Sequence, residues 1–193
     1  IRADNLFLRQ KTKKQIFKYL LFNNQKGGAI LNPILLGGIL KNFYDKFSMT
    51  LFDDRLKLQK IIYLMKIKRF NLGYSFSLYL YGPYSTELTK DGFQIFQITS
   101  FDKLNPVEPK DENLNATFQG FIKNLAISDR KNDVTWLEIA SSYIYLKNNT
   151  NLDDNKIVEL IMNKRDNFNI DIKEIENIIE KLKRDDYFKE NAK

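Results

Sequence analysis

Residues 51–70 carry two apolar stripes when they are placed on a helix at about 100° per residue. The first stripe consists of Leu51, Leu58, Ile61, Ile62 and Met65. The second stripe lies on roughly the opposite side and consists of Phe52, Leu56, Tyr63, Ile67 and Phe70. A helix that is apolar on two sides needs neighbours on both of them, so this pattern predicts the central helix of the fold.

Local signals predict the two ends of this helix. Thr50 and Asp53 have the spacing of a capping box, and the carboxylates of Asp53 and Asp54 suit the positive end of the helix dipole. Gly73 is expected to end the segment, because glycine readily takes the left-handed conformation that follows many helices.

The apolar period changes to two across residues 74–81, which predicts a half-buried strand. Phe76, Leu78 and Leu80 are expected on its buried face. The opposite face carries Ser75, Ser77, Tyr79 and Tyr81.

Gly82 and Pro83 are expected to break this strand and to form a turn. Ser85 is predicted to be the N-cap of the helix that follows, with Glu87 in its first turn. The inner face of that helix is expected to carry Leu88, Gly92, Ile95, Phe96 and Thr99.

Two short stretches carry a family likeness, LQKIIYL at residues 58–64 and YLYGPYSTEL at residues 79–88. Together they resemble the YwgA-like family of prokaryotic proteins. They are more distantly similar to the SocA/Panacea antitoxin domain, in which a KLQK-type helix is followed by a G-P-V/Y turn. The likeness continues through residues 136–140 to the last helices, so that it covers roughly Leu51 to Phe188.

The resemblance implies a small, mainly helical, winged-helix-like module associated with mobile elements, toxin neutralisation or defence. It supplies no catalytic residues. In that family the KLQK-type helix lies near the start of the chain. Residues 1–48 are therefore predicted to be an N-terminal helical extension, and residues 49–193 the family-like domain.

The chain contains neither cysteine nor histidine. This composition excludes disulfides, cysteine nucleophiles, zinc sites built on Cys or His, and catalysis by a histidine acid or base. The chain also lacks a glycine-rich phosphate loop. We therefore expect no cofactor, no resident metal ion and no enzymatic activity.

The net charge of +7 and the isoelectric point near 9.3 favour acidic partners, either nucleic acid or an acidic protein face.

The longest apolar run, residues 29–40, is interrupted by Asn32 and Pro33, so it predicts a core helix and not a membrane span. Charged residues near the start argue against a signal peptide. A cytoplasmic location is expected, because a chain without cysteine fits a reducing compartment.

Apolar periodicity predicts further helices on both sides of the central unit. They are expected over residues 4–22, from Pro33 towards Phe47, over 112–127, after an Asp133 cap, around Ile157, and over 172–182. Gly37 and Gly38 are expected to permit close approach of another element. Residues 100–111 are expected to form a loop, and the last two helices have the spacing of a helix-turn-helix.

The candidate partner-binding residues lie at the end of the predicted strand and in the turn after it. They are Tyr79, Tyr81, Gly82, Pro83, Tyr84 and Ser85. Exposed tyrosines at such a place anchor protein partners or stack on bases. The pattern leaves open whether Tyr79 and Tyr81 are exposed or are covered by residues 1–48.

Nucleic-acid binding is the alternative function. Its candidate residues are Lys57, Lys60, Lys66, Lys68, Arg69, Lys11, Lys13 and Lys14. Cations of this kind neutralise phosphates, but lysines on helices also serve as an ordinary solvated face.

A metal-dependent nuclease is a third reading. It requires the carboxylates of Asp53, Asp54, Glu87 and Asp91 to converge on a cation. Carboxylates at helix starts more often satisfy backbone amides and the helix dipole, which favours a structural role for all four.

These observations predict a mainly α (α+β) fold, a helical domain with a small antiparallel sheet and a winged-helix-like core. The leading functional hypothesis is a non-catalytic regulatory or neutralising module that binds a protein partner, such as a toxin or effector. The identity of that partner and the oligomeric state are left open by the sequence.

Overall fold

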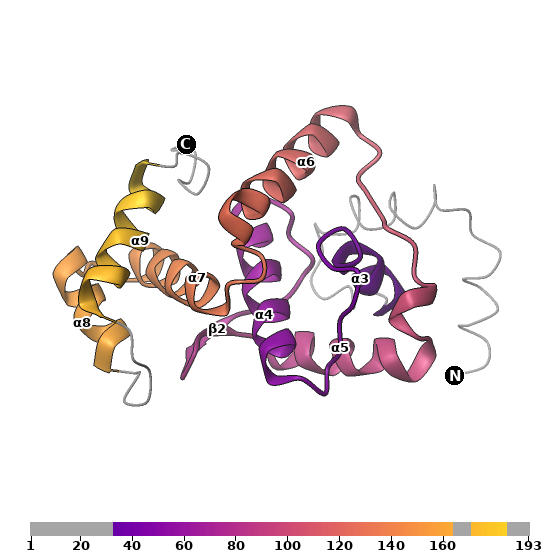
Figure 1. Ribbon diagram of the computed structural model, residues 1–193, viewed down its shortest axis with the longest axis horizontal. Coiled ribbons are helices and arrows are strands. Elements are labelled where there is room, and N and C mark those ends of the chain that lie inside the picture. The colour runs from indigo at the N-terminus through magenta and orange to yellow at the C-terminus, as the bar shows by residue number, and fades with distance from the viewer. Residues whose placement is uncertain (1–32, 164–170, 185–193) are drawn as a thin grey trace.

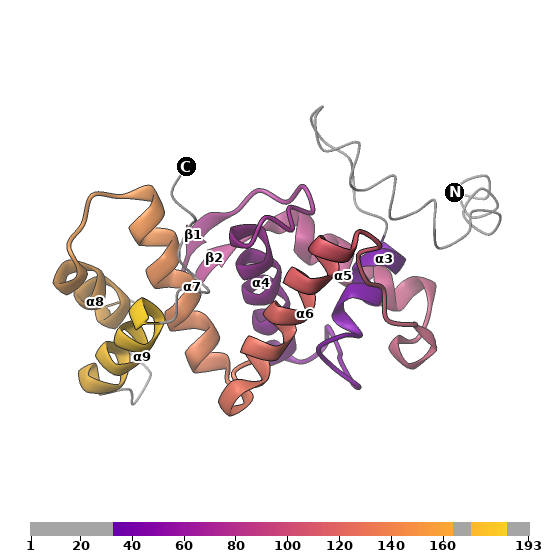
Figure 2. The same cartoon turned by 90° about the horizontal axis from the view of Figure 1, so that it is seen from above.

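A computed structural model describes residues 33–163 and 171–184 (Figures 1 and 2). These residues form seven α-helices, two short 3-10 helices and one two-stranded antiparallel sheet. In chain order the elements are α3 (Pro33–Leu40), α4 (Phe52–Ile67), β1 (Ser77–Tyr79), β2 (Gly82–Tyr84), α5 (Thr86–Ile98), η1 (Phe101–Lys103), α6 (Glu112–Ala126), η2 (Ile127–Asp129), α7 (Val134–Asn149), α8 (Asp154–Asn163) and α9 (Ile172–Arg184). The prediction of a mainly α fold with a small antiparallel sheet is confirmed, while the winged-helix likeness of its centre stays a prediction.

Helix α4 occupies the centre of the molecule, as its two apolar stripes predict. Every residue from Leu58 to Met65 is buried. Figures 1 and 2 show α3 and α5 on one side of α4 and α7 on the other, with α8 and α9 beyond α7. One hydrophobic cluster runs through all of these helices, so the described residues share a single core.

The β-region differs from its prediction. The expected strand over residues 74–81 is only three residues long as β1, and Gly82 and Pro83 lie in β2 instead of forming the turn. The two strands pair in the register Ser77–Tyr84, Leu78–Pro83 and Tyr79–Gly82, so the turn consists of Leu80 and Tyr81. Pro83 is tolerated in a strand here because a two-stranded sheet has an edge position for it.

The two ends of α4 also differ from their predictions. The N-cap is Leu51, which makes no side-chain cap, so the capping box expected of Thr50 and Asp53 is wrong. Helix α4 ends before Gly73. Arg69 takes the left-handed conformation with φ 67°, its N–H donates to the carbonyl of Lys66, and the N–H of Phe70 donates to that of Met65. This is a Schellman motif built on a residue other than glycine.

Close approach explains both glycines of α3, as predicted. A Cβ on Gly37 would lie 2.5 Å from Cδ1 of Leu104, and one on Gly38 would lie 2.5 Å from Cγ2 of Val107. The N–H of Val107 donates to the carbonyl of Gly38 at 2.9 Å. The loop over residues 100–111 is therefore pinned against α3.

The segment after α3 is joined to the chain before α7. The Tyr44 hydroxyl donates to the carbonyl oxygen of Lys131, and Nζ of Lys131 donates to the carbonyl oxygen of Phe43 at 2.8 Å. The ring of Phe43 also meets Phe118 and Phe121 of α6 edge-on. Residues 33–48 thus belong to the same core as the later helices. Their assignment to an N-terminal extension stays a prediction, and residues 1–32 of that extension lie outside the described residues.

The apolar run over residues 29–40 contributes α3, whose side chains from Leu35 onward are buried in this core. The helix expected from Pro33 towards Phe47 ends at Leu40, and the residues after it form turns. None of the helices in the described ranges combines the length and the apolar character that crossing a bilayer requires.

Replacement of Arg69 by Gly should stabilise the protein. A residue with a Cβ pays about 1 kcal/mol or more in the left-handed region, whereas glycine does not. After allowance for the larger entropy of glycine in the unfolded chain, Arg69→Gly should raise the free energy of unfolding by about 0.5–1 kcal/mol in urea denaturation. The neighbouring Lys68 has φ −87°, which suits an ordinary side chain, so Lys68→Gly should lower the free energy of unfolding instead. Equal changes in the free energy of unfolding for the two substitutions would contradict the left-handed conformation of Arg69.

Candidate functional site

Lys60 lies inside the molecule, although it carries a charge. Its side chain projects from α4 towards the hairpin, and only 1% of its surface is exposed. Nζ donates a hydrogen bond to the carbonyl oxygen of Pro83 at 2.9 Å. A buried ammonium group needs such acceptors, because burial without them costs several kcal/mol. Lys60 is therefore a structural link between α4 and β2.

Gln59, the preceding residue, binds the backbone of Ser85 at both of its polar groups. Its Oε1 accepts from the N–H of Ser85 at 2.8 Å, and its Nε2 donates to the carbonyl oxygen of Ser85 at 2.9 Å. The Ser85 hydroxyl in turn accepts from the N–H of Leu88, which confirms Ser85 as the N-cap of α5. The two adjacent residues of α4 thus hold the chain from Pro83 to Ser85.

Gly82 is required where β2 meets α7. Its φ is +89°, and a Cβ would lie 2.3 Å from Oγ of Ser142 and 3.3 Å from Nζ of Lys60. No side chain fits there without moving α7 or Lys60. Gly82, Pro83 and Ser85, three of the predicted partner-binding residues, are all buried and serve the scaffold.

Apolar side chains gather at the end of the hairpin, a surface that we call the hairpin tip. Its members are Leu51, Phe52, Tyr79, Leu80 and Tyr81. Four of the ten exposed large hydrophobic residues in the described ranges belong to it, with exposed fractions of 57% for Leu51, 46% for Phe52, 59% for Tyr79 and 57% for Leu80. Tyr81 is half-buried and links the turn of the hairpin to the start of α4, since its ring lies 5.3 Å from that of Phe52 in an edge-on contact.

The described residues cover the tyrosines of this region to different extents. Tyr79 is exposed, while Tyr81 and Tyr84 are half-buried. The rings of Tyr79 and Tyr84 lie 5.8 Å apart on one face of the hairpin. Sequence reasoning missed Leu51, Phe52 and Leu80, because it placed them on buried stripes. Leu51 precedes the first turn of α4 and Leu80 lies in the turn, so neither follows the period of a regular element.

The cations predicted for nucleic-acid binding are mostly engaged within the protein. Nζ of Lys57 lies 3.3 Å from Oδ1 of Asp54, and Nζ of Lys66 donates to the carbonyl oxygen of Tyr74 at 3.1 Å. Lys68 is half-buried and Arg69 is exposed at the end of α4. Lys11, Lys13 and Lys14 lie outside the described residues.

The four candidate metal-binding carboxylates do not share one site, and Asp54, Glu87 and Asp91 each have a separate partner within the protein. Oδ2 of Asp54 accepts from the N–H of Ser48, and that of Asp91 accepts from the Tyr74 hydroxyl at 2.7 Å. The pKa of Glu87 is lowered by its own backbone N–H and by the Ser85 hydroxyl. Asp53 is exposed. Across the described part of the chain, no three carboxylates are grouped so that they would hold a metal ion.

Helices α8 and α9, the predicted helix-turn-helix pair, are joined to α7 through Asp154. Its carboxylate accepts from the Tyr143 hydroxyl at 3.1 Å and from Nζ of Lys147 at 2.9 Å, and it contacts Nζ of Lys183. The two lysines lower the pKa of Asp154 to about 2. Arg184 pairs with Glu180 at 3.0 Å, so Lys183 and Arg184 of α9 both have carboxylate partners.

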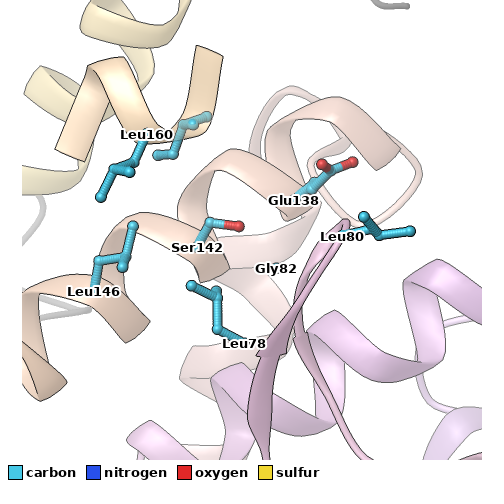
Figure 3. Close-up of a pocket in the computed structure, with 8 residues that line it drawn as sticks. Leu78, Leu80, Gly82, Glu138, Ser142, Leu146 and Leu160 are labelled. Carbon is cyan, nitrogen blue, oxygen red and sulfur yellow. The ribbon is translucent and has the colours of Figure 1, made fainter. Parts of the chain in front are cut away.

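A small cavity lies between the hairpin, α7 and α8 (Figure 3). Leu78 points into it from the hairpin, and its polar lining comes from Glu138 and Ser142 of α7. Measured as the room for the centre of a water molecule, its volume is about 10 Å³. This space suits one water molecule and not a metabolite.

Loss of the buried Lys60 side-chain amine should destabilise the protein more than loss of the half-buried Lys57 amine. Lys60→Met removes a charged donor from the Pro83 carbonyl, so we expect the free energy of unfolding to fall by about 2–3 kcal/mol in urea denaturation. Lys57→Met makes the same change on the same helix, where the pair with Asp54 is partly solvated, and should cost less than about 1 kcal/mol. Equal costs would refute the structural role of Lys60.

The Tyr74–Asp91 hydrogen bond should make stability depend on pH. Burial raises the pKa of Asp91, and the hydrogen bond from Tyr74 opposes that rise. Tyr74→Phe removes this hydrogen bond and therefore raises the pKa of Asp91 further. The ionised carboxylate then destabilises the folded state, most strongly at pH values above that pKa. The variant should lose about 2 kcal/mol at about pH 7 and less below about pH 3, where Asp91 is protonated in both states. In an Asp91→Asn background the same substitution should cost less, and a loss that grew as the pH fell would contradict the pairing.

No protein-family model, no curated protein and no solved structure matches this chain. Membership of the YwgA-like family therefore stays a prediction. The residues that carry the resemblance nevertheless meet in space, since Gln59 and Lys60 of the first stretch hold Pro83 and Ser85 of the second. The functional conclusion has to rest on this geometry.

Proposed function

We propose that this chain is a non-catalytic regulatory or neutralising module of the cytoplasm that binds a protein partner, such as a toxin or a defence effector, through the hairpin tip. The observation that carries the proposal is the exposed cluster of Leu51, Phe52, Tyr79 and Leu80. Contiguous exposed apolar side chains mark interaction sites, and aromatic residues contribute most to binding at protein interfaces.

The rigidity of the hairpin supports this proposal. An isolated two-stranded hairpin is marginally stable in water. Here β2 is held to α4 by Lys60 and Gln59, and Gly82 lies against Ser142 of α7. A preorganised tip loses little conformational entropy when a partner binds, which favours affinity.

The positions of the polar groups also support a binding function over a catalytic one. The Ser85 hydroxyl caps α5, and Asp54 and Asp91 are occupied by internal hydrogen bonds. The cavity beside the hairpin is too small for a substrate larger than water. What this region offers to the outside is apolar surface.

The proposal is tested by co-expressing the full chain with the products of its neighbouring genes and measuring the affinity of any complex by calorimetry. The double substitution Tyr79→Ser with Leu80→Ser should weaken binding about 100-fold, because it removes two exposed anchors. The matched control is Phe93→Ser with Ile98→Ser, which removes two side chains of similar exposure on α5, a helix that leads away from the hairpin (Figure 1). The control should change the affinity by less than about threefold.

Two outcomes would count against the proposal. One is the absence of any complex with a neighbouring gene product; the other is an equal loss in both double variants. Binding to DNA or RNA that falls steeply with rising salt and ignores the tip substitutions would instead favour the nucleic-acid alternative.

A further inference from the structure

The two edges of the hairpin differ in what they offer to another strand. In an antiparallel ladder, pairs that exchange hydrogen bonds alternate with pairs that do not. Pro83 has no N–H and its carbonyl oxygen accepts from Lys60, so Leu78–Pro83 is a pair without mutual hydrogen bonds. The edge along β2 is therefore closed, since β2 lies against α4 and α7 and Pro83 offers no donor.

The edge along β1 has the opposite character. Because Leu78 does not bond to Pro83, its N–H and carbonyl groups point away from β2. No hydrogen bond from residues 33–163 or 171–184 reaches either group. Edge strands are commonly protected by lysine, proline or a bulge, and β1 carries none of these. Such an edge is a template for another strand.

We infer that this edge pairs with the same edge of a second copy of the chain, so that two hairpins form one four-stranded sheet across a two-fold axis. Antiparallel pairing of two identical strands is self-complementary, as the interface of a closed dimer has to be. The outward groups set the register, since Leu78 exchanges both hydrogen bonds with Leu78 of the second copy. The inference goes beyond the proposed function, because it concerns self-association and needs no other protein.

The side chains of β1 and of the residues beside it are complementary to themselves in this register. Side chains at alternate positions of a strand share one face. Leu80, which is 57% exposed, comes to lie opposite Phe76 of the second copy, a half-buried residue. On the other face, Tyr79 comes to lie opposite Ser77, and both are exposed in a single chain. Apolar side chains thus meet apolar ones, and cross-strand pairs of this kind stabilise sheets.

The stretch around β1 is uncharged. Residues 70–86 contain no Asp, Glu, Lys or Arg, so like charges on the two strands do not oppose their approach. A charged partner strand, in contrast, finds no opposite charge on this stretch. A strand of three residues makes a small interface, so we expect a weak dimer with a dissociation constant on the order of 10–100 μM.

The test measures the mass of the full chain by sedimentation equilibrium between about 1 μM and about 1 mM, a range that spans weak association. Ser77→Lys and Ser77→Glu each place two like charges diagonally across the axis, and each should weaken the dimer at least about tenfold. An equimolar mixture of the two variants places opposite charges there, and should restore the dimer to within about threefold. The matched controls, Ser100→Lys and Ser100→Glu, change an exposed serine beyond α5 and should stay within about twofold.

Hydrogen exchange supplies a second measurement that needs no variant. The Leu78 amide should exchange at least about threefold more slowly at about 1 mM than at about 1 μM, because the dimer holds it in a hydrogen bond. A chain that stays monomeric throughout this range would overturn the inference. So would a dimer that the Ser77 variants leave unchanged, or one that leaves the Leu78 amide unprotected. The Ser77 variants keep every side chain of the hairpin tip, so failure of the dimer would leave the proposed function standing.

Discussion

The hydrogen bonds from Gln59 and Lys60 to the backbone of Pro83 and Ser85 are the interaction on which the rest of the structure depends. They attach the sheet to the central helix α4, and they fix the point at which α5 begins. A buried charge and a buried amide are expensive unless their partners are in place, so this arrangement admits very few alternatives. Because β2 is bound on its inner side, β1 and the hairpin tip are the parts of this unit that face outward.

The elements that the sequence predicted correctly are those with strong local signals. The long helix over residues 52–67 followed from its stripes, and the caps at Ser85 and Asp133 followed from their side-chain chemistry. The close approach at Gly37 and Gly38 followed from glycines placed where a helix would otherwise avoid them. At the two caps the deciding interaction lies within a few residues of chain, whereas the glycines were recognisable although their contacts with Leu104 and Val107 are distant in the sequence.

The wrong predictions concern residues whose conformation depends on a contact with a residue far away in the sequence. Gly82 and Pro83 have the composition of a turn, yet they form a strand because Lys60 and Ser142 hold them beside Leu78. The left-handed conformation of Arg69 has no sequence signal, and it ended α4 earlier than Gly73 would have done. The period of two across residues 74–81 predicted one strand, whereas the structure has two strands of three residues joined by a two-residue turn.

The candidate site was predictable only in part. Tyr79 was a candidate because of its place on the outer face of a strand, although the pattern left its exposure open, and among the described residues it is exposed. Composition alone does not separate Lys60, which is buried, from Arg69, which is exposed, because both are cations on or beside one helix. Phe52 and Leu80 were expected inside, and only the relative positions of α4 and the turn reveal that they are outside.

The reciprocal bonds of Phe43 and Tyr44 with Lys131 have a consequence for biosynthesis. Their partners lie 87 and 88 residues apart, so the segment after α3 cannot reach its final neighbours until the chain before α7 has left the ribosome. At bacterial or eukaryotic elongation rates this interval lasts on the order of ten seconds. During that time α3 already has its neighbours in α5 and at Leu104, and Phe43 gains its neighbours in α6, but the two bonds to Lys131 still lack their partner. Closure of the segment after α3 onto the chain before α7 is therefore a late step in the folding of the nascent chain.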